Sequence, residues 1–277
     1  MDVATLEPLK AKADGTFTVL QLSDSHLFAG NRGELLGVNT RDSFAAVLQA
    51  VVAQNREYDF VIVTGDISQD YSAESYKVFA SMIKLLGSNV FFLPGNHDDG
   101  PLMYRMLGDL GVNTAKRLIC GRWQFLFLNS EVYGMAHGWA QREDLEYVMR
   151  CVQERQDLYA VVCIHHLPLM VGSYWLDTQT LHNQDEFAAF INRMPEVKLV
   201  LSGHVHQEVD TVVNQVRYIA SPSTSIQFAP HSSDFEIDAC QGPGWRWLYF
   251  HADGTVGTEI CRLPPDRFRI NLGAEGY

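Results

Sequence analysis

Five short segments of the chain hold His, Asp and Asn residues at spacings that suit metal ions. These segments are DSH at 24–26, GD at 65–66, GNHD at 95–98, HH at 165–166 and GHVH at 203–206. A mixture of imidazole nitrogens with carboxylate and amide oxygens favours Mn, Fe, Co or Zn over Mg or Ca, which prefer oxygen alone. The set therefore predicts a metal site, although each segment alone would also suit an ordinary polar turn.

The number of candidate ligands predicts two divalent ions. A dinuclear site, with its ions about 3.5–4 Å apart, needs one carboxylate that contacts both. Asp66 suits this bridging position. Two further groups would complete the ions: Asp24, His26 and His206 for one, and Asn96, His165 and His204 for the other. Fe or Mn is the first choice of metal, with Zn or Co as alternatives.

Two adjacent His residues compete for one ligand position. We take His165 as the ligand because it stands where the apolar run 159–164 ends, and we keep His166 as the alternative. Successive strand residues face opposite sides of a sheet, so both are not expected to bind one ion.

Each segment follows a short apolar run that is typical of a buried strand. These strands are expected at 17–22, 59–66, 89–98, 159–166 and 197–206, with a further one at 123–130. Helical apolar spacing separates them at 39–54, 72–86, 142–155 and 185–194, and Ser72 is a possible N-cap. In such α/β folds ligands bind at the carboxyl edge of the sheet, so the five segments should meet there. Gly65, Gly95 and Gly203 would let the backbone pass close to the ions.

After residue 206 the chain is expected to contain strands joined by turns, without further helices. These are 215–221, 245–256 and 257–263, and Asp253–Gly254 is a hairpin signal. The aromatic cluster Trp245, Trp247, Tyr249 and Phe250 indicates strand packing more than a platform for a nucleobase. We expect one domain over 1–277, with a metal-binding core at 17–210 and C-terminal strands and tail at 211–277.

Composition excludes several classes of function. A net charge of −12 without a Lys/Arg run argues against nucleic-acid or anionic-membrane binding. The chain has neither a long apolar run nor the order of a signal peptide, which predicts a cytoplasmic protein. Its five Cys have no CxxC spacing and indicate reduced thiols. The isolated His137, His182, His231 and His251 are expected to be structural or surface residues, although His137 and His231 could approach a substrate.

Taken in order, the five segments resemble the five blocks of the calcineurin-like metallophosphoesterases over residues 17–210. Further stretches resemble the bacterial class III 3′,5′-cyclic AMP phosphodiesterases. These are LLGVNT at 35–40, SPSTSIQFAP at 221–230, GPGWRWLYFHADG at 242–254 and the terminal EGY. The resemblance implies a four-layer α-β-β-α sandwich in which two mixed sheets pack together.

The resemblance also implies a reaction and roles in it. The metal ligands would be those given above, with Asp66 and His97 as catalytic residues. His26, Asp66, Asn96, His97 and His206 would contact the substrate. A metal-bound hydroxide would attack phosphorus in cyclic AMP, and His97 would protonate the departing 3′-oxygen to give 5′-AMP. Such an enzyme would work as a monomer or a homodimer.

Two alternatives remain at this point. The same ligand set would serve a phosphoesterase that acts on another cyclic nucleotide, a linear phosphodiester or a phosphomonoester. A metal-loaded scaffold without enzymatic activity belongs to a different class of function. His97 argues against the scaffold, because a docking module needs no proton donor beside its metal site.

Overall fold

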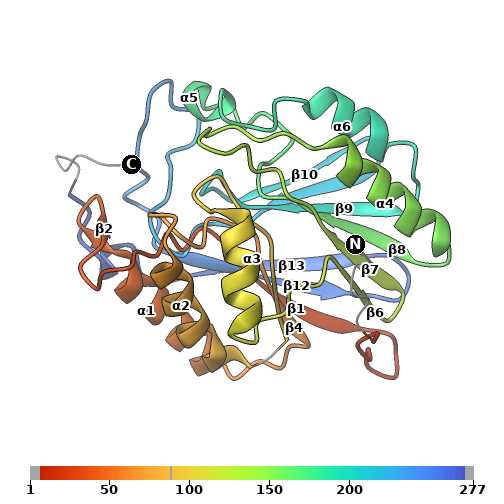
Figure 1. Ribbon diagram of the computed structural model, residues 1–277, viewed down its shortest axis with the longest axis horizontal. Coiled ribbons are helices and arrows are strands. Elements are labelled where there is room, and N and C mark those ends of the chain that lie inside the picture. The colour runs from red at the N-terminus through yellow and green to blue at the C-terminus, as the bar shows by residue number, and fades with distance from the viewer. Residues whose placement is uncertain (1–6, 88, 272–277) are drawn as a thin grey trace.

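The computed structural model describes residues 7–87 and 89–271 of the chain, and a pair of mixed β-sheets forms the centre of this region (Figure 1). The first sheet has five strands in the order β13 (Val256–Arg262), β12 (Gly244–Phe250), β1 (Phe17–Leu22), β4 (Phe60–Val63) and β5 (Val90–Phe92). The second has six strands in the order β10 (Val209–Val213), β11 (Val216–Ala220), β9 (Val197–Ser202), β8 (Tyr159–Cys163), β7 (Trp123–Phe127) and β6 (Arg117–Cys120). β2 (Glu34–Leu35) and β3 (Val38–Asn39) form a small separate ladder.

The strands that lead to the candidate ligands run parallel within each sheet. β1, β4 and β5 are parallel neighbours in the first sheet, as are β7, β8 and β9 in the second. The carboxyl ends of these strands therefore lie at a common edge of each sheet, and the segments with the candidate ligands follow at that edge. Antiparallel pairing of β12 with both β1 and β13 brings the C-terminal region of the chain into the first sheet.

Helices cover the outer face of each sheet, which gives the predicted four layers. α1 (Thr40–Ala53), α2 (Ala73–Ile83) and α3 (Gly100–Asp109) pack on the first sheet. α4 (Arg142–Glu154), α5 (Tyr174–Asp177) and α6 (Gln184–Ile191) pack on the second (Figure 1). A short 3₁₀ turn at Lys84–Leu86 continues from α2, and another at Pro265–Arg267 comes after β13. The family fold implied by the sequence is confirmed.

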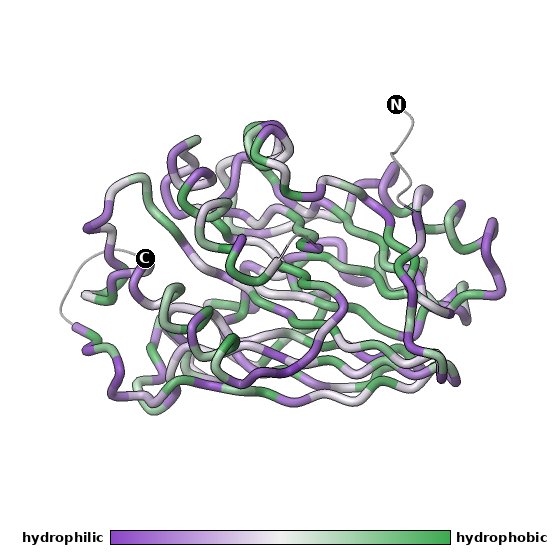
Figure 2. Tube along the Cα trace, turned by 90° about the horizontal axis from the view of Figure 1, so that it is seen from below, coloured by the Kyte–Doolittle hydropathy of each residue, from purple (hydrophilic) through white to green (hydrophobic). Residues whose placement is uncertain are grey.

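The inner faces of the two sheets share an aromatic core. Phe17 stacks on Phe250 with ring centroids 4.9 Å apart, and Phe60 meets Phe125 edge to face at 5.1 Å. Because each sheet is covered on both faces, its strands read as continuous apolar runs. Figure 2 shows this pattern as green strands in the interior and purple along the outer turns. The expected packing role of the C-terminal aromatics is confirmed, since Trp245, Trp247 and Phe250 are buried.

Several boundaries differ from the sequence-based expectations. Strands expected to continue through the ligand segments end earlier, for example β4 at Val63 and β9 at Ser202, so the candidate ligands lie in loops. The Ser72 cap is confirmed, because its side chain accepts the N–H of Ser75. The hairpin at Asp253–Gly254 is also confirmed, since β12 and β13 pair on either side of it.

Some elements were not expected at all. α3, β6, β10 and the short α5 had no counterpart among the predicted elements. The terminal EGY motif lies outside the described residues. Among the residues that the structure describes, no helix is both long and apolar enough to cross a membrane.

Candidate metal centre

The loops that follow β1, β4, β5, β8 and β9 bring the candidate ligands together. In three groups of side chains, all ligand atoms lie within 4.8 Å of one another and all residues come from the predicted set or are His97. These groups are Asp24 with His26 and His206, Asp24 with Asp66 and His165, and His26 with Asp66 and His97. Five of the seven predicted ligands and His97 thus surround one location, as expected of parallel strands that end at one edge.

Asp66 occupies the middle of this arrangement. Its Oδ2 atom lies 3.7 Å from His26 Nε2 and 3.4 Å from His165 Nε2. The same oxygen is buried and makes no hydrogen bond to another described residue. One carboxylate therefore faces both halves of the cluster.

The remaining residues divide into two sides. On one side, His206 Nε2 lies 3.4 Å from Asp24 Oδ1 and 3.0 Å from His26 Nε2. On the other, Asn96 Oδ1 lies 3.2 Å from His165 Nε2 and 3.0 Å from His204 Nδ1. These contacts place Asp24 with His26 and His206, and Asn96 with His165 and His204.

Protein acceptors fix the tautomers of three of these imidazoles. The Nδ1–H groups of His26, His165 and His206 face Gln69 Oε1 at 2.6 Å, Thr64 O at 2.7 Å and Ile226 O at 2.9 Å. In the neutral form of each ring, the Nε2 atom then carries the lone pair, and it faces the cluster. Such outer contacts orient ligating His residues in metal sites. Gln69 was not singled out from the sequence, because only the folded loop after β4 brings it beside His26.

The cluster is held by an unusual backbone conformation. Positive φ values of 46° to 69° occur at five of the seven candidate ligands, namely Asp24, His26, Asp66, His204 and His206. A non-glycine residue in this region costs about 1–3 kcal/mol, and such residues concentrate at functional sites. Backbone hydrogen bonds from Asp24 N to Gly65 O and from His26 N to Asp66 O tie the two loops together in this conformation.

Glycine is required where the loops approach the cluster most closely. A Cβ atom at Gly95 would overlap the Asp66 carboxylate, and one at Gly203 would overlap the Ser23 hydroxyl. Gly65 has a φ of +96°, and a Cβ there would meet the His165 ring. The structural reason expected for these three glycines is therefore confirmed.

Burial sets the protonation of the cluster. It lowers the pKa of His26 and of His204 to about 3, so both imidazoles are neutral near pH 7. For His165, burial acts in the same direction, but the Asp66 carboxylate outweighs it and raises the pKa to about 9. Asp66 itself has a pKa well below its usual value, because neighbouring imidazoles outweigh the effect of its burial.

Both ring nitrogens of His166 contact protein groups outside the candidate ligand set. Its Nδ1 lies 2.8 Å from Ser130 Oγ and its Nε2 lies 3.2 Å from the carbonyl of Ala136. Although His166 forms a close group with His165 and His204, both of its ring nitrogens thus have protein partners. This geometry favours His165 over His166 as the ligand.

His97 is the partly exposed residue of the cluster. Its backbone N–H donates to Asp66 Oδ1 at 2.8 Å, and its ring meets that of His26 edge to face at 5.2 Å. The half-exposed Tyr71 ring stacks beside it at 6.3 Å. A substrate that reached the cluster from solvent would therefore pass this imidazole.

Asp98 positions the loops and was given no role from the sequence. Its buried carboxylate accepts the backbone N–H groups of Gly95, Ile67 and Ser68 at 2.9 to 3.2 Å. Burial and the nearby Asp66 raise the pKa of Asp98 to about 7. The GNHD segment thus combines candidate ligands with a carboxylate that joins two ligand loops.

The other isolated His residues contribute none of these groups. His137 and His182 stack with ring centroids 3.7 Å apart, and His231 and His251 are exposed. All five Cys have free thiols, and Cys120, Cys151 and Cys163 are buried.

The arrangement fits two divalent cations. His26 Nε2 and His206 Nε2 lie 3.0 Å apart, and the buried Asp66 Oδ2 makes no hydrogen bond to the described residues. Within residues 7–87 and 89–271, neither Asp24 nor Asp66 pairs with Lys or Arg. Positive charge stabilises buried carboxylates and converging imidazole nitrogens, and the mixed N and O donor set suits first-row transition metals.

Comparison with known proteins agrees with this site. The profile of the family described as calcineurin-like phosphoesterase matches residues 17–208, so the chain belongs to this family. Membership of this family implies that the cluster binds divalent metal ions.

Named relatives resemble the chain along nearly its whole length. It is 41% identical to the 3′,5′-cyclic adenosine monophosphate phosphodiesterase CpdA of Escherichia coli strain K12, over 99% of both chains. It is 34% identical to the protein of that name from Pseudomonas aeruginosa, over 95% of this chain and 96% of the other. The chain is also 36% identical to the 3′,5′-cyclic-nucleotide phosphodiesterase alr5338 of Nostoc, over 89% of this chain and 92% of that protein.

Solved structures share the fold at low sequence identity. A dimetal phosphatase from Danio rerio aligns with a TM-score of 0.61 at 12% identity, covering 92% of this chain and 99% of that one. GAP50, described as the anchor in the inner membrane complex of Plasmodium, aligns with a TM-score of 0.59 at 10% identity, covering 92% and 86%.

Proposed function

We propose that the protein is a dinuclear-metal hydrolase that cleaves 3′,5′-cyclic AMP to 5′-AMP. The observation that carries the proposal is the Asp66 carboxylate, which faces His26 Nε2 and His165 Nε2 at 3.7 and 3.4 Å from the centre of a buried ligand set. Identity of 41% to a cyclic AMP phosphodiesterase over 99% of the chain supports the substrate.

The proposed ligands follow the two sides of the cluster. One ion would be held by Asp24, His26, Asp66 and His206, and the other by Asp66, Asn96, His165 and His204. Fe or Mn is the proposed metal, with Zn or Co as alternatives, because imidazole and carboxylate ligands suit all four. When bound, two such ions neutralise charge on the phosphoryl oxygens and lower the pKa of water from 15.7 to about 7.

The chain's own residues would position the substrate and move a proton. His26, Asp66, Asn96, His97 and His206 surround the place for the phosphate and are the proposed contacts. His97 is the proposed general acid for the 3′-oxygen, because its backbone N–H holds it to Asp66 Oδ1 at 2.8 Å and the residue is partly exposed. The loops hold these side chains before substrate arrives, so little reorganisation is needed during the reaction.

We also propose a domain organisation, a cellular location and a class of partners for the chain. We treat residues 1–277 as one domain, since β12 and β13 pair into the sheet that contains β1. We place the protein in the cytoplasm, where five free thiols would stay reduced. Its acidic net charge of −12 speaks against nucleic-acid and anionic-membrane partners, and either a monomer or a homodimer is compatible with the site.

A substrate panel tests the proposal. The protein loaded with Mn²⁺ or Fe²⁺ should convert 3′,5′-cyclic AMP to 5′-AMP, identified by chromatography against 3′-AMP. It should act more slowly on nucleoside monophosphates. Efficient phosphomonoester hydrolysis with no product from cyclic AMP would contradict the proposal.

A further inference from the structure

A pocket of about 190 Å³ lies beside the metal centre and is lined in part by His206. The His206 ring stacks on Phe228, with centroids 4.1 Å apart and planes 2° from parallel. His206 Nε2 belongs to the ligand cluster, so this side chain borders both the cluster and the pocket. A substrate whose phosphate sits at the cluster would extend toward a neighbouring space of this kind.

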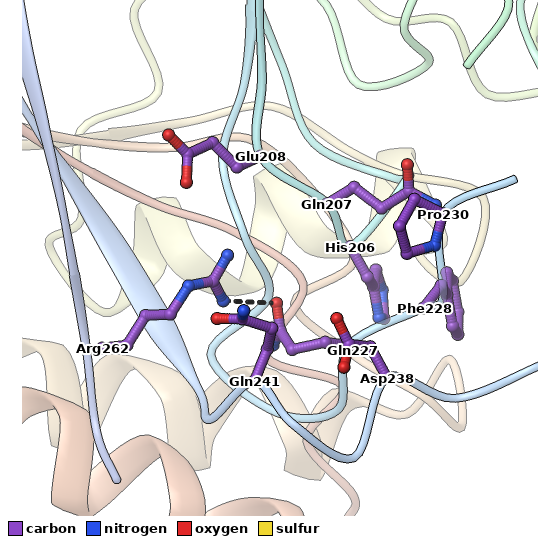
Figure 3. A pocket seen from close by; sticks show the side chains of 9 residues that line it. All are labelled: His206, Gln207, Glu208, Gln227, Phe228, Pro230, Asp238, Gln241 and Arg262. Atoms are coloured by element: carbon purple, nitrogen blue, oxygen red, sulfur yellow. Dashed lines mark hydrogen bonds between the residues drawn. The ribbon is translucent and has the colours of Figure 1, made fainter. Parts of the chain in front are cut away.

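Hydrogen bonds already fix one section of the pocket wall. The Gln227 Nε2 group donates to the carbonyls of Ser223 and Ser225 at 2.8 and 3.4 Å. Its Oε1 accepts from Arg262 Nη1 at 3.1 Å, drawn as a dashed line in Figure 3. Gln227 and Arg262 therefore form a rigid wall, and the Gln227 amide has little capacity left for a ligand.

Asp238 and Gln241, in the loop before β12, keep side-chain polar atoms available for a ligand. Asp238 uses Oδ1 to accept the backbone N–H of Cys240 at 2.9 Å, which leaves Oδ2 for a donor. The Gln241 side-chain amide makes no hydrogen bond to the described residues, and its backbone N–H donates to Asp238 O. Figure 3 shows both side chains at the pocket, together with Gln227 and His206.

The charges of the pocket select against a second anion. Asp238 and Glu208 both line it, whereas Arg262 is the one cation among the lining residues. A phosphate would meet two carboxylates there. A neutral heterocycle with an exocyclic amine suits it better, because a carboxylate accepts from an amine and an amide pairs with a ring nitrogen.

We propose that this pocket holds the adenine base of the substrate, with Asp238 accepting the exocyclic amine and Gln241 pairing with a ring nitrogen. The proposal rests on the function proposed above, and it names the residues that distinguish adenine from guanine. Guanine carries a carbonyl oxygen where adenine carries its amine, so it would place an acceptor against the Asp238 carboxylate. A site built to bind a donor rejects an analogue that lacks it, because the bound base would shield the Asp238 acceptor from water and leave it unpaired.

The test compares base preference in wild type and Asp238→Asn. The measured quantity is the ratio of kcat/KM for cyclic AMP to that for cyclic GMP. Asparagine keeps the oxygen that accepts from Cys240 N and replaces the other with an NH₂ donor, so the fold should be retained. The ratio should be well above one in wild type and fall about ten- to a hundred-fold in the variant, which corresponds to one good base contact.

A second variant and a matched control strengthen the experiment. Gln241→Ala changes an exposed side chain and should raise KM for cyclic AMP more than it lowers kcat, because the contact is remote from the reacting atoms. Asp234→Asn makes the same charge change on an exposed residue of the same segment that does not line the pocket. It should keep the wild-type ratio.

The outcomes separate this proposal from the proposed function. If wild type cleaves cyclic AMP but Asp238→Asn and Asp234→Asn have equal ratios, the base lies elsewhere and the pocket assignment is wrong. If wild type cleaves a bis-nitrophenyl diester but not cyclic AMP, the proposed function itself fails. A fall in the ratio confined to Asp238→Asn supports both.

Discussion

His97 is the residue whose proposed role can be tested most cleanly, because it lies beside the ligand cluster without belonging to the proposed ligand set. A ribose 3′-alkoxide is strongly basic and needs a proton as it leaves, whereas a nitrophenolate departs readily without one. General acids typically contribute 10²–10⁴-fold to a rate. His97→Ala should therefore lose about 10²-fold or more on cyclic AMP and far less on a bis-nitrophenyl diester, measured as kcat.

Metal content separates the possible explanations of that result. His97→Ala should retain both ions, since its imidazole is not a proposed ligand. Equal losses on the two substrates with the ions retained would show that His97 grips the phosphate rather than donating a proton. Equal losses of activity on the two substrates, together with the loss of an ion, would show that His97 is a metal ligand.

Asp66 and Asn96 should differ in their effect on metal binding. Asp66 faces both sides of the cluster, whereas Asn96 Oδ1 contacts only His165 and His204. Asp66→Ala should therefore lose both ions and all activity, while Asn96→Ala should lose chiefly one ion, as measured by elemental analysis per chain. The exposed His182 provides a control, because His182→Ala should keep full metal content. Two ions retained in Asp66→Ala would rule out the bridging role.

At the level of residues, the sequence could name the cluster but not its support. Asp24, Asp66 and the GNHD segment were identifiable because each follows an apolar run at the end of a strand. The contact of Gln69 with His26 was not identifiable, because it depends on how two loops pack. The orientation of His166 toward Ser130 likewise depends on a loop more than thirty residues away in the chain.

The cap of α2 gives a prediction for a single helix. The Ser72 hydroxyl accepts the N–H of Ser75, one of the unpaired donors at the start of α2. Ser72→Ala should lower the free energy of unfolding by about 1 kcal/mol, measured by urea denaturation. Ser81 is an exposed serine within the same helix, and Ser81→Ala should leave stability unchanged or raise it slightly. Equal effects of the two substitutions would show that the cap does not stabilise the helix.

The predictability of an element depended on how much apolar surface it buries. Core strands such as β4, with all four residues buried, stand out as apolar runs. β10 lies at a sheet edge with mostly exposed residues, so VDTVV gives no such signal. α3 was missed because Gly100–Pro101 suggests a turn, although Asp99 caps the helix and Pro at its start is favourable. Leu102, Met103, Met106 and Leu107 carried the helical spacing that could have indicated it.

The thiols of the folded protein should differ widely in their reactivity, because the fold buries some Cys residues and exposes others. Cys240 is exposed, whereas Cys120 and Cys163 have no exposed surface between the packed sheets. Alkylation of the folded protein without reductant should modify Cys240 first and spare Cys120 and Cys163, as read by mass spectrometry. In denaturant all five Cys should react. A pair that reacts in denaturant only after reductant is added would show a disulfide and contradict the cytoplasmic assignment.

The four layers explain why the site can be so strained and still persist. The cluster lies where loops from both sheets meet, and the aromatic core between the sheets fixes these loops relative to each other. The sequence indicated this architecture mainly through its resemblance to a family, because periodicity alone does not show which strands share a sheet. The placement of β12 beside β1 required contacts across more than two hundred residues.

The central claim is that two metal ions held by this cluster hydrolyse cyclic AMP, and one measurement on a single preparation tests it. Release of 5′-AMP from cyclic AMP should be followed together with metal content, before chelation, after chelation and after addition of Mn²⁺ or Fe²⁺. Activity should disappear as the ions are removed and return as about two ions per chain are restored. Full activity in metal-stripped protein would contradict the central claim.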